Sequence, residues 1–226
     1  MIDGRTVLGV IPARGGSKRL PGKNLLPVAG RPMIAWTVAA ARGSKYIDRL
    51  IVSTDDPRIA DAARGLGVEV PFLRPAELSS DTATSEDVLI HALDSVGGDF
   101  ALAVLLQPTS PLCRTEDIDA ALETCVAAEA PACVSVHVPA KPLAWLMTKN
   151  GAGCLRRAFA PDQVPEPAYM PNGAIFIIDV AAFRRDRTLY PANAVPYVMP
   201  AERSIDVDTE ADLAAAEALL QRRANA

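Results

Sequence analysis

The sequence predicts one α/β domain built on a doubly wound, mostly parallel sheet, and two observations carry this prediction. First, short runs rich in Val, Ile and Leu alternate with longer segments whose apolar residues recur every three or four positions. The short runs are typical of strands buried on both faces of a parallel sheet, and the longer segments are typical of helices packed on it. Second, a chain of 226 residues is long enough for one large core but short for two.

The first half of the chain establishes the alternation. Strands are predicted within residues 6–13, 48–56 and 100–110, and each is expected to be central in the sheet because its apolar run is continuous. Helices are predicted within residues 31–45 and 86–96. Trp36 falls on the apolar spacing of the first helix, so we expect it in the core.

The second half continues the pattern and then interrupts it. Thr115 is the expected N-cap of a helix within residues 115–130, which is followed by a strand at 132–138. Residues 139–171 carry many prolines and weak periodicity, so they are predicted to be an insertion. The remaining expected elements are further strands or edges within residues 173–183 and 190–200, and a closing helix within residues 208–226.

The composition excludes several classes of protein. Charged residues interrupt every apolar run well before the ~18 residues of a membrane span, and charge follows the first apolar stretch where a secretory signal would be cleaved. We therefore expect a cytoplasmic protein with no membrane partner. The net charge of −4 argues against non-specific binding to nucleic acid. The cysteines form no C-x-x-C pair and are expected to be reduced thiols: Cys113, Cys125, Cys133 and Cys154.

A cationic, glycine-containing loop follows the first strand. It holds four cations, a glycine pair and a hydroxyl: Arg14, Lys18, Arg19, Lys23, Gly15-Gly16 and Ser17. Glycines allow tight turns that leave backbone amides open to a ligand, and the cations neutralise phosphate charge. In an open α/β sheet the ligand crevice lies beyond the carboxyl ends of the strands, so the loops after Ala13, Ser53 and Leu106 are expected to converge there. The loop is neither a Walker A loop nor G-x-G-x-x-G, and a solvated surface turn is the structural alternative.

An acidic pair lies near the end of the chain, in SIDVDTEADL. Asp206 and Asp208 point the same way if the segment is extended, so both carboxylates would reach one Mg²⁺ ion. Helix capping is the alternative, because Asp208 or Thr209 would cap the following helix. Capping accounts for Asp208 but not for Asp206. Together, the basic loop and the acidic pair predict that a magnesium-bound nucleoside triphosphate is held between them for nucleotidyl transfer.

Six segments in order give a more specific indication. They are IPARGGSKRLPGKN, DRLIVSTDD, LRPAELSSDTATS, LLQPTSPL, PNGAIFI and SIDVDTEADL, spread from about residue 7 to residue 220. In these segments the chain resembles the CMP-sialic acid synthetase family, the cytidylyltransferases that activate N-acylneuraminate and related nonulosonic acids, including legionaminic acid. The resemblance implies a Rossmann-like, GT-A-like nucleotidyltransferase fold over residues 1–226. It also implies a homodimer in which the insertion at about 139–171 contributes to dimerisation and to the partner's sugar pocket.

The resemblance also implies roles for individual residues. The phosphate-binding positions are Arg14, Gly15, Gly16, Ser17 and Lys23, with Asn24 at the ribose; Arg74, Ala83 and Ser85 recognise cytosine; Gln107, Asn172 and Tyr169 contact the acceptor sugar; and Asp206 and Asp208 hold Mg²⁺. Arg14 and Lys23 join the two aspartates as the catalytic set. Cytosine presents an amino donor and ring acceptors, so backbone groups and one guanidinium can distinguish it from other bases.

Several of these residues have structural alternatives. Arg74 would also suit an exposed loop, Ser85 would also cap the helix at 86–96, and Gln107 would also simply end a strand. Asn172-Gly173 is also an ordinary turn signal. Tyr169, like Trp145, would suit a subunit interface as well as a sugar site.

The expected chemistry is in-line attack by the anomeric hydroxyl of a nine-carbon keto-sugar acid on the α-phosphorus of CTP, with release of pyrophosphate. No histidine is placed by sequence as a general base, so a metal-activated hydroxyl or water is the preferred proton acceptor. N-acetylneuraminate enzymes of the family often carry basic residues where this sequence has Ala144 and Met170. Lys141, Arg156 or Arg157 would then bind the sugar carboxylate, or the acceptor is a relative such as legionaminic acid.

Two further activities stay open at this point. Cytidylyltransferases for eight-carbon keto sugars, the CMP-Kdo type, share the fold and the chemistry. A GT-A glycosyltransferase would use the same Asp-x-Asp metal motif but would consume a nucleotide sugar. The non-enzyme alternative is a nucleotide-binding protein with a decayed site. Against it, a chemically competent side chain fills every expected nucleotide and metal position.

Overall fold

The computed structural model describes residues 1–164 and 167–224, and its centre is a six-stranded sheet. The strand order is β10-β6-β9-β5-β1-β4, and all strands run parallel except β9, which is antiparallel to both of its neighbours. The strands are β1 (Val7–Pro12), β4 (Arg49–Ser53), β5 (Leu102–Leu106), β6 (Ala132–His137), β9 (Met170–Asp179) and β10 (Val195–Val198). The predicted doubly wound, mostly parallel sheet is confirmed.

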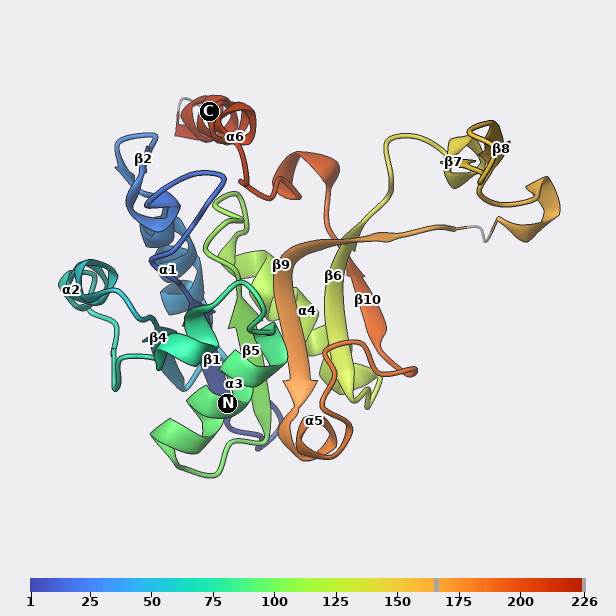
Figure 1. Cartoon of the computed structure of the whole chain (residues 1–226). Coiled ribbons are helices and arrows are strands. Elements are labelled where there is room, and N and C mark those ends of the chain that lie inside the picture. The colour runs from blue at the N-terminus through green and yellow to red at the C-terminus, as the bar shows by residue number, and fades with distance from the viewer. Residues whose placement is uncertain (165–166, 225–226) are drawn as a thin grey trace.

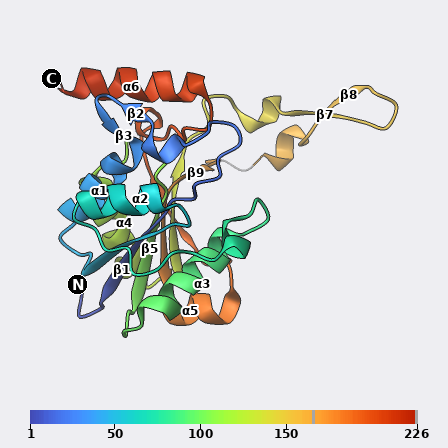
Figure 2. The same cartoon turned by 60° about the vertical axis from the view of Figure 1, so that its left-hand side comes forward.

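Helices cover both faces of this sheet (Figure 1, Figure 2). One face carries α1 (Met33–Gly43), α2 (Pro57–Gly65) and α4 (Thr115–Ala127), and the other carries α3 (Ser85–Val96) and α5 (Val180–Asp186). Successive strand residues point to opposite faces, so Val7 and Ile11 contact the first layer, whereas Leu8 contacts the second. Strands buried on both sides therefore need the continuous apolar runs seen in the sequence.

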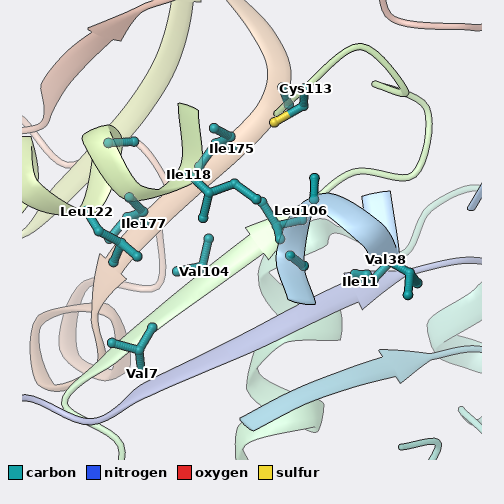
Figure 3. Close-up of a cluster of buried hydrophobic side chains, with 14 of the residues drawn as sticks. Val7, Ile11, Val38, Val104, Leu106, Cys113, Ile118, Leu122, Ile175 and Ile177 are labelled. Carbon is teal, nitrogen blue, oxygen red and sulfur yellow. The ribbon is translucent and has the colours of Figure 1, made fainter. Parts of the chain in front are cut away.

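The larger core lies between the sheet and the α1–α4 layer (Figure 3). Val104 and Leu106 of β5 meet Ile118 and Leu122 of α4 there, and all four side chains are 0–1% exposed. Burial of one such side chain stabilises the fold by about 1.5–3 kcal/mol. The sheet is therefore a rigid platform for the loops at its carboxyl edge.

Strand β4 differs from its prediction, because it lies at the edge of the sheet and not at the centre. Its outer side is nevertheless partly paired. Val52 N–H donates to Glu69 O at 2.9 Å, and Arg74 N–H donates to Thr54 O at 2.7 Å. A continuous apolar run predicts a strand with a neighbour on each side, and these bonds supply the second neighbour for part of β4. They also fix Arg74 beside the end of the sheet.

Two predicted helix caps are wrong by one residue. Thr84, not Ser85, caps α3, with its Oγ1 accepting the Asp87 N–H at 3.1 Å. Thr115 is the first residue of α4 and donates its hydroxyl to Ala40 O at 2.9 Å, so Arg114 is the N-cap residue. In each case a threonine and its neighbour compete for the cap, and packing decides which one takes it.

Two helices were not predicted. Residues 173–183 were expected to be strand throughout, but β9 ends at Asp179, whose Oδ1 accepts the Ala182 N–H at 2.8 Å and caps α5. The short helix α2 begins after Asp56, which accepts the Arg58 N–H at 2.8 Å, and has proline as its first residue. Both helices are short, so their apolar spacing repeats too few times to stand out.

The closing helix α6 (Glu210–Ala224) lies over the short hairpin of β2 (Pro27–Val28) and β3 (Arg31–Pro32). The Ala29 N–H donates to Glu217 Oε1 at 2.9 Å across this contact. Trp36 was expected in the core, but it is only half-buried. The Arg31 guanidinium stacks on its ring at 3.6 Å. Helix α6 thus holds the chain end close to the loop that follows β1.

An arm leaves the sheet between β6 and β9 (Figure 1). This arm, residues 138–169 without the undescribed 165–166, contains the two-stranded hairpin of β7 (Met147–Lys149) and β8 (Leu155–Arg157) and two turns of 3-10 helix, η3 (Leu143–Trp145) and η4 (Pro161–Gln163). It falls within the predicted insertion, although β9 already begins at Met170. Among the described residues, no helix combines the length and the apolar character needed to cross a bilayer.

Candidate active site

A pocket of about 380 Å³ opens at the carboxyl ends of the parallel strands. Pro12 at the end of β1 and Gln107 after β5 line it, together with Gly173 and Phe176 of the antiparallel β9. The loop after β4 reaches the same place through Asp55, which accepts the Gly15 N–H at 2.9 Å. The predicted convergence of the three loops at one sheet edge is therefore confirmed.

Gly15 allows the loop after β1 to approach the loop after β4. A Cβ on Gly15 would lie 2.8 Å from both Cβ and Oδ2 of Asp56, which is closer than real Cβ contacts come. Asp56 cannot move away freely, because its Oδ1 caps α2. Glycine at this position is therefore required by packing as well as by any ligand. Gly16 has open space around the corresponding position.

Replacing Gly15 with alanine is expected to displace the loop and lower kcat/KM for the nucleotide by about one to two orders of magnitude, as a small misplacement of binding groups does. The control is Gly65→Ala at the end of α2, outside the pocket lining, where no neighbour lies within 4 Å of the added carbon. Steady-state kinetics on both variants measure the difference. Equal activity of Gly15→Ala and wild type would contradict the packing argument.

The cationic loop and the acidic pair meet in a single subunit. Lys23 Nζ lies 2.9 Å from Asp208 Oδ1 and also donates to Val207 O at 3.2 Å, and Arg19 Nη2 lies 2.7 Å from Asp208 Oδ2. Lys23 and Asp208 are separated by 185 positions in the chain. A ligand that binds one group is thus within reach of the other, as the sequence analysis predicted.

The remaining loop cations pair across the mouth of the pocket. Arg14 Nη1 lies 3.1 Å from both Asp81 Oδ1 and Ser80 O, and Lys18 forms an ion pair with the same aspartate. All three charged side chains are well exposed, so these pairs contribute little to stability and exchange readily. Hydrogen bonding and charge from Lys18 lower the pKa of Asp81 below its usual value, so it stays ionised.

The acidic pair has the chemistry of a magnesium site. Asp206 is open to solvent but sits in a concave wall of the pocket, where desolvation and the charge of Asp208 raise its pKa above the usual value, against a hydrogen bond from Thr109. Among the described residues no third His, Cys, Asp or Glu joins the two aspartates as a metal ligand. Mg²⁺ is commonly held by one or two carboxylates plus substrate phosphates, so Asp206 and Asp208 fit it as a pair that the nucleotide completes.

The opposite wall of the pocket is built around Arg74, which is only 5% exposed. Its Nε donates to Ser79 Oγ at 3.1 Å, and Asp55 lies 3.8 Å from Nη2. Burial lowers the pKa of this guanidinium from its usual value, partly offset by Asp55. The alternative that Arg74 is a surface residue is wrong. Ala83 and Ser85 line the same wall, beside Arg74.

Asn24 carries an unusual polar atom. Its side chain is 4% exposed and lines the pocket, its Nδ2 donates to Arg14 O at 2.9 Å, and its Oδ1 has no hydrogen-bond partner among the described residues. A buried acceptor without a partner costs free energy. A ligand hydroxyl would satisfy it.

The expected sugar-contacting residues separate into two groups. Gln107 lines the pocket. Asn172 is 5% exposed and outside the pocket lining, with its amide bonded to Ser135 Oγ and Ser204 Oγ at 2.5 and 2.9 Å. Tyr169 is 39% exposed at the base of the arm, and it too lies outside the pocket lining. The loop residues Gly15, Gly16 and Ser17, which were expected to bind phosphate, also lie outside the pocket lining.

The sequence analysis missed three residues of this site. Asp55 accepts the Gly15 N–H and faces Arg74, Asp81 pairs with two loop cations, and Thr109 lines the pocket together with Asp206. Each lies inside a segment that the sequence analysis quoted. Acids that immediately follow a buried strand were the available signal for Asp55.

The comparisons with known proteins agree with this geometry. A model of the Cytidylyltransferase family matches residues 8–184. The CMP-N,N'-diacetyllegionaminic acid synthase of Legionella pneumophila is 35% identical over 224 residues, covering 95% of this chain and 96% of the relative. The N-acylneuraminate cytidylyltransferase of Streptococcus agalactiae serotype III (strain NEM316) is 37% identical over 210 residues, covering 90% of this chain and 50% of the relative, so the chain spans about half the length of that protein.

Solved structures give the same fold. CMP:2-keto-3-deoxy-manno-octonic acid synthetase complexed with CTP superposes with a TM-score of 0.73 at 22% identity, over 96% of this chain and 99% of the other. The 4-diphosphocytidyl-2C-methyl-D-erythritol synthase of Anaerococcus prevotii gives a TM-score of 0.67 at 14% identity, over 97% and 100%. With the family match and a full-length relative above 30% identity, the chain belongs to the cytidylyltransferase family and is a nucleotidyltransferase of the acylneuraminate type.

Proposed function

We propose that this protein transfers CMP from CTP to a nonulosonic acid, giving the CMP-sugar and pyrophosphate. The observation that supports the proposal is the contact between Lys23 and Asp208, which brings cations suited to phosphate and acids suited to a divalent metal into one pocket. The full-length relative is named as a legionaminic acid synthase, and the shorter match as an N-acylneuraminate enzyme. Both names support an acceptor of the nine-carbon keto-acid class.

The pocket suggests a place for each part of CTP. Lys23, Arg19 and Arg14 face the triphosphate, Asn24 Oδ1 accepts a hydrogen bond from the ribose, and Arg74 with the backbone near Ala83 reads the cytosine edge. Arg74 suits this role because it is buried and held in place by its bond to Ser79. A base that cannot hydrogen-bond to the guanidinium would leave buried polar groups unsatisfied. Asp206 and Asp208 would hold Mg²⁺, which when bound supplies charge neutralisation of the phosphates.

The chain's own residues then position the reaction. Asp208 would help to hold the metal when it is bound, and Lys23, which lies 2.9 Å from that acid, would then pair with phosphate oxygens of the ligand instead. The anomeric hydroxyl of the acceptor gives its proton to a water or hydroxide, and its oxygen forms a bond to the α-phosphorus. The bond from that phosphorus to the oxygen that bridges the α- and β-phosphates breaks, and pyrophosphate leaves. Neither histidine of the chain lines the pocket, so positioning and charge supply the rate enhancement.

Release of pyrophosphate from CTP, measured with a panel of acceptors, tests the proposal. The panel contains N-acetylneuraminate, legionaminic acid, pseudaminic acid and the eight-carbon keto sugar of the CMP-Kdo enzymes. Turnover is expected with a nine-carbon acid, and addition of a chelator is expected to stop it. Turnover with the eight-carbon acid alone would replace the proposed acceptor, and hydrolysis of a nucleotide sugar without use of CTP would indicate a glycosyltransferase.

We further propose that the arm packs on a second copy of the chain. Large apolar side chains are exposed along it: Val138 at 57%, Trp145 at 67%, Leu146 at 51%, Met147 at 45% and Leu155 at 73%. Trp145 and Leu146 also line a cavity of about 340 Å³ at the base of the arm, beside Lys141 and Met170. Exposed apolar surface of this extent marks an interaction site, and the expected homodimer would cover it.

Replacing Trp145 and Leu155 with serine is expected to convert a dimer into a monomer, because it removes the two most exposed apolar side chains of the arm. Sedimentation velocity measures the change. The control is Tyr190→Ser, an aromatic residue of 53% exposure that lies outside the arm. A wild-type protein that is monomeric at high concentration would contradict the proposal.

A further inference from the structure

Asp117 makes more contacts than a capping residue needs. Its side chain is 1% exposed in the first turn of α4, and its Oδ2 accepts the Arg114 N–H at 3.0 Å, which completes the cap. Three further donors come from the C-terminal part of the chain. Arg203 donates through Nη2 to Oδ1 at 2.7 Å and through Nε to Oδ2 at 3.0 Å, and the Tyr197 hydroxyl donates to Oδ1 at 3.1 Å. A bidentate guanidinium pair fixes orientation as well as distance.

Arg203 stands at the start of the segment that bears the acidic pair. It ends the short 3-10 helix η5 (Ala201–Arg203), five positions before Asp208. The segment is held at two more points. Ser204 Oγ accepts from Asn172 Nδ2 at 2.9 Å, and the N–H of the fully buried Val207 donates to Thr109 O at 2.8 Å.

The same carboxylate closes a second loop of the pocket. Residues 107–114 connect β5 to α4, and Gln107 and Thr109 of this loop line the pocket. Because Asp117 binds the Arg114 N–H and the Arg203 side chain at once, it joins the end of this loop to the start of the acidic segment. Neither Asp117 nor Arg203 lines the pocket.

We propose that Asp117 and Arg203 are positioning residues that hold Asp206 and Asp208 at the spacing a divalent cation needs. This inference rests on the proposed function, since it concerns the metal that the two acids would hold with CTP. Without the pair, the acidic segment keeps its bonds at Ser204 and Val207 and the ion pairs of Asp208 with Lys23 and Arg19, but it loses the anchor at its start. A cation that displaces these ion pairs must then order the segment itself. In the described part of the chain no hydrogen bond or ion pair joins Asp117 or Arg203 to Arg74 or Asn24, so we expect the pocket around Arg74 and Asn24 to keep its structure.

Mn²⁺ binding to the full chain in the presence of CTP tests the proposal, with electron paramagnetic resonance measuring free Mn²⁺ and protein-free CTP as the blank. For Arg203→Met the Mn²⁺ dissociation constant is expected to rise about tenfold or more, as for residues that support metal ligands, and for Arg203→Lys by less. Binding of CTP in excess chelator, measured by calorimetry, is expected to stay within about twofold of wild type, because no hydrogen bond or ion pair among the described residues joins the pair to Arg74 or Asn24.

A matched control separates positioning from general destabilisation. Arg49 also pairs with a carboxylate through two nitrogens, since its Nη2 and Nε both donate to Glu69 Oε2, at 2.8 and 3.2 Å, at the amino end of β4 and away from the pocket. Arg49→Met is expected to leave Mn²⁺ affinity unchanged. If Arg203→Met fails to fold, Tyr197→Phe removes one hydrogen bond and keeps the ion pair, and a smaller rise in the same constant is expected.

Two results would overturn the inference. One is wild-type Mn²⁺ affinity in the folded Arg203 or Tyr197 variants. The other is a parallel loss of Mn²⁺ and of metal-free CTP binding, which a loosened fold would produce. Failure of the proposed function gives a different result, because no acceptor in the panel then releases pyrophosphate, whereas the Mn²⁺ comparison uses no acceptor.

Discussion

The variant Asp208→Ala is expected to lose about three orders of magnitude in the rate of CMP-sugar formation, because a metal that neutralises phosphate supplies several kcal/mol of transition-state stabilisation. Asp208 is one of the two acids of the proposed magnesium site and the direct partner of Lys23 and Arg19. Its side chain is 28% exposed, so its loss leaves no deeply buried charge and the fold is expected to remain near intact.

Pyrophosphate release as a function of Mg²⁺ concentration measures this effect, and circular dichroism checks the fold. Asp61→Ala is the control, because the one ion pair of this exposed acid among the described residues is with Arg64 on α2. Magnesium-dependent turnover at the wild-type level in Asp208→Ala would refute the assignment of the acid to the metal.

The variant Lys23→Met is expected to lower kcat/KM for CTP by about 100-fold, as removal of one preorganised charge from a transition state does. Methionine preserves most of the side-chain volume and removes the ammonium group. Lys23 is 17% exposed and points at the acidic pair, so its charge acts in a partly desolvated pocket where it is screened less than at the surface. Steady-state kinetics and calorimetric titration with CTP measure the loss.

Lys18→Met provides the matched comparison for Lys23. Lys18 is 82% exposed, and in the part of the chain that the structure describes its one ion pair is with Asp81. The loss is therefore expected to stay below about threefold, as for an exposed ion pair. Equal losses for the two lysines would indicate that the loop acts through its total charge and not through the position of Lys23.

The fold and the centre of the site follow patterns that the sequence contains. Continuous apolar runs predict strands buried on both faces, and the rule that ligands bind at the carboxyl ends of such strands brings together the loops after β1, β4 and β5. The sequence analysis placed the basic loop and the acidic pair on either side of one triphosphate, because such a polyanion needs both; the direct contact of Lys23 with Asp208 is an addition from the structure. The argument from continuous apolar runs fails for β4, which it predicted to be a central strand. This edge strand is partly paired by the backbone of Glu69 and Arg74, so it has the composition of a central one.

Other parts of the site depend on contacts that no local pattern encodes. Asp117 and Arg203 are 86 positions apart and each looks like an ordinary surface charge in the sequence. Thr84 and Ser85 are both good capping residues, and only the backbone decides between them. The sequence likewise cannot show that the Asn172 amide is directed into the protein, toward Ser135 and Ser204.

The ion pairs in the pocket also determine how selective it is toward other polyanions. The four loop cations Arg14, Lys18, Arg19 and Lys23 already have the carboxylates of Asp81 and Asp208 as partners, with the carboxylate of Asp206 nearby. A visiting anion must therefore displace these internal counterions, which cancels much of its electrostatic gain. We therefore expect free polyphosphates and nucleic acids, abundant in any cell, to gain little from that exchange, and a nucleotide that also contacts Arg74 and Asn24 to gain more.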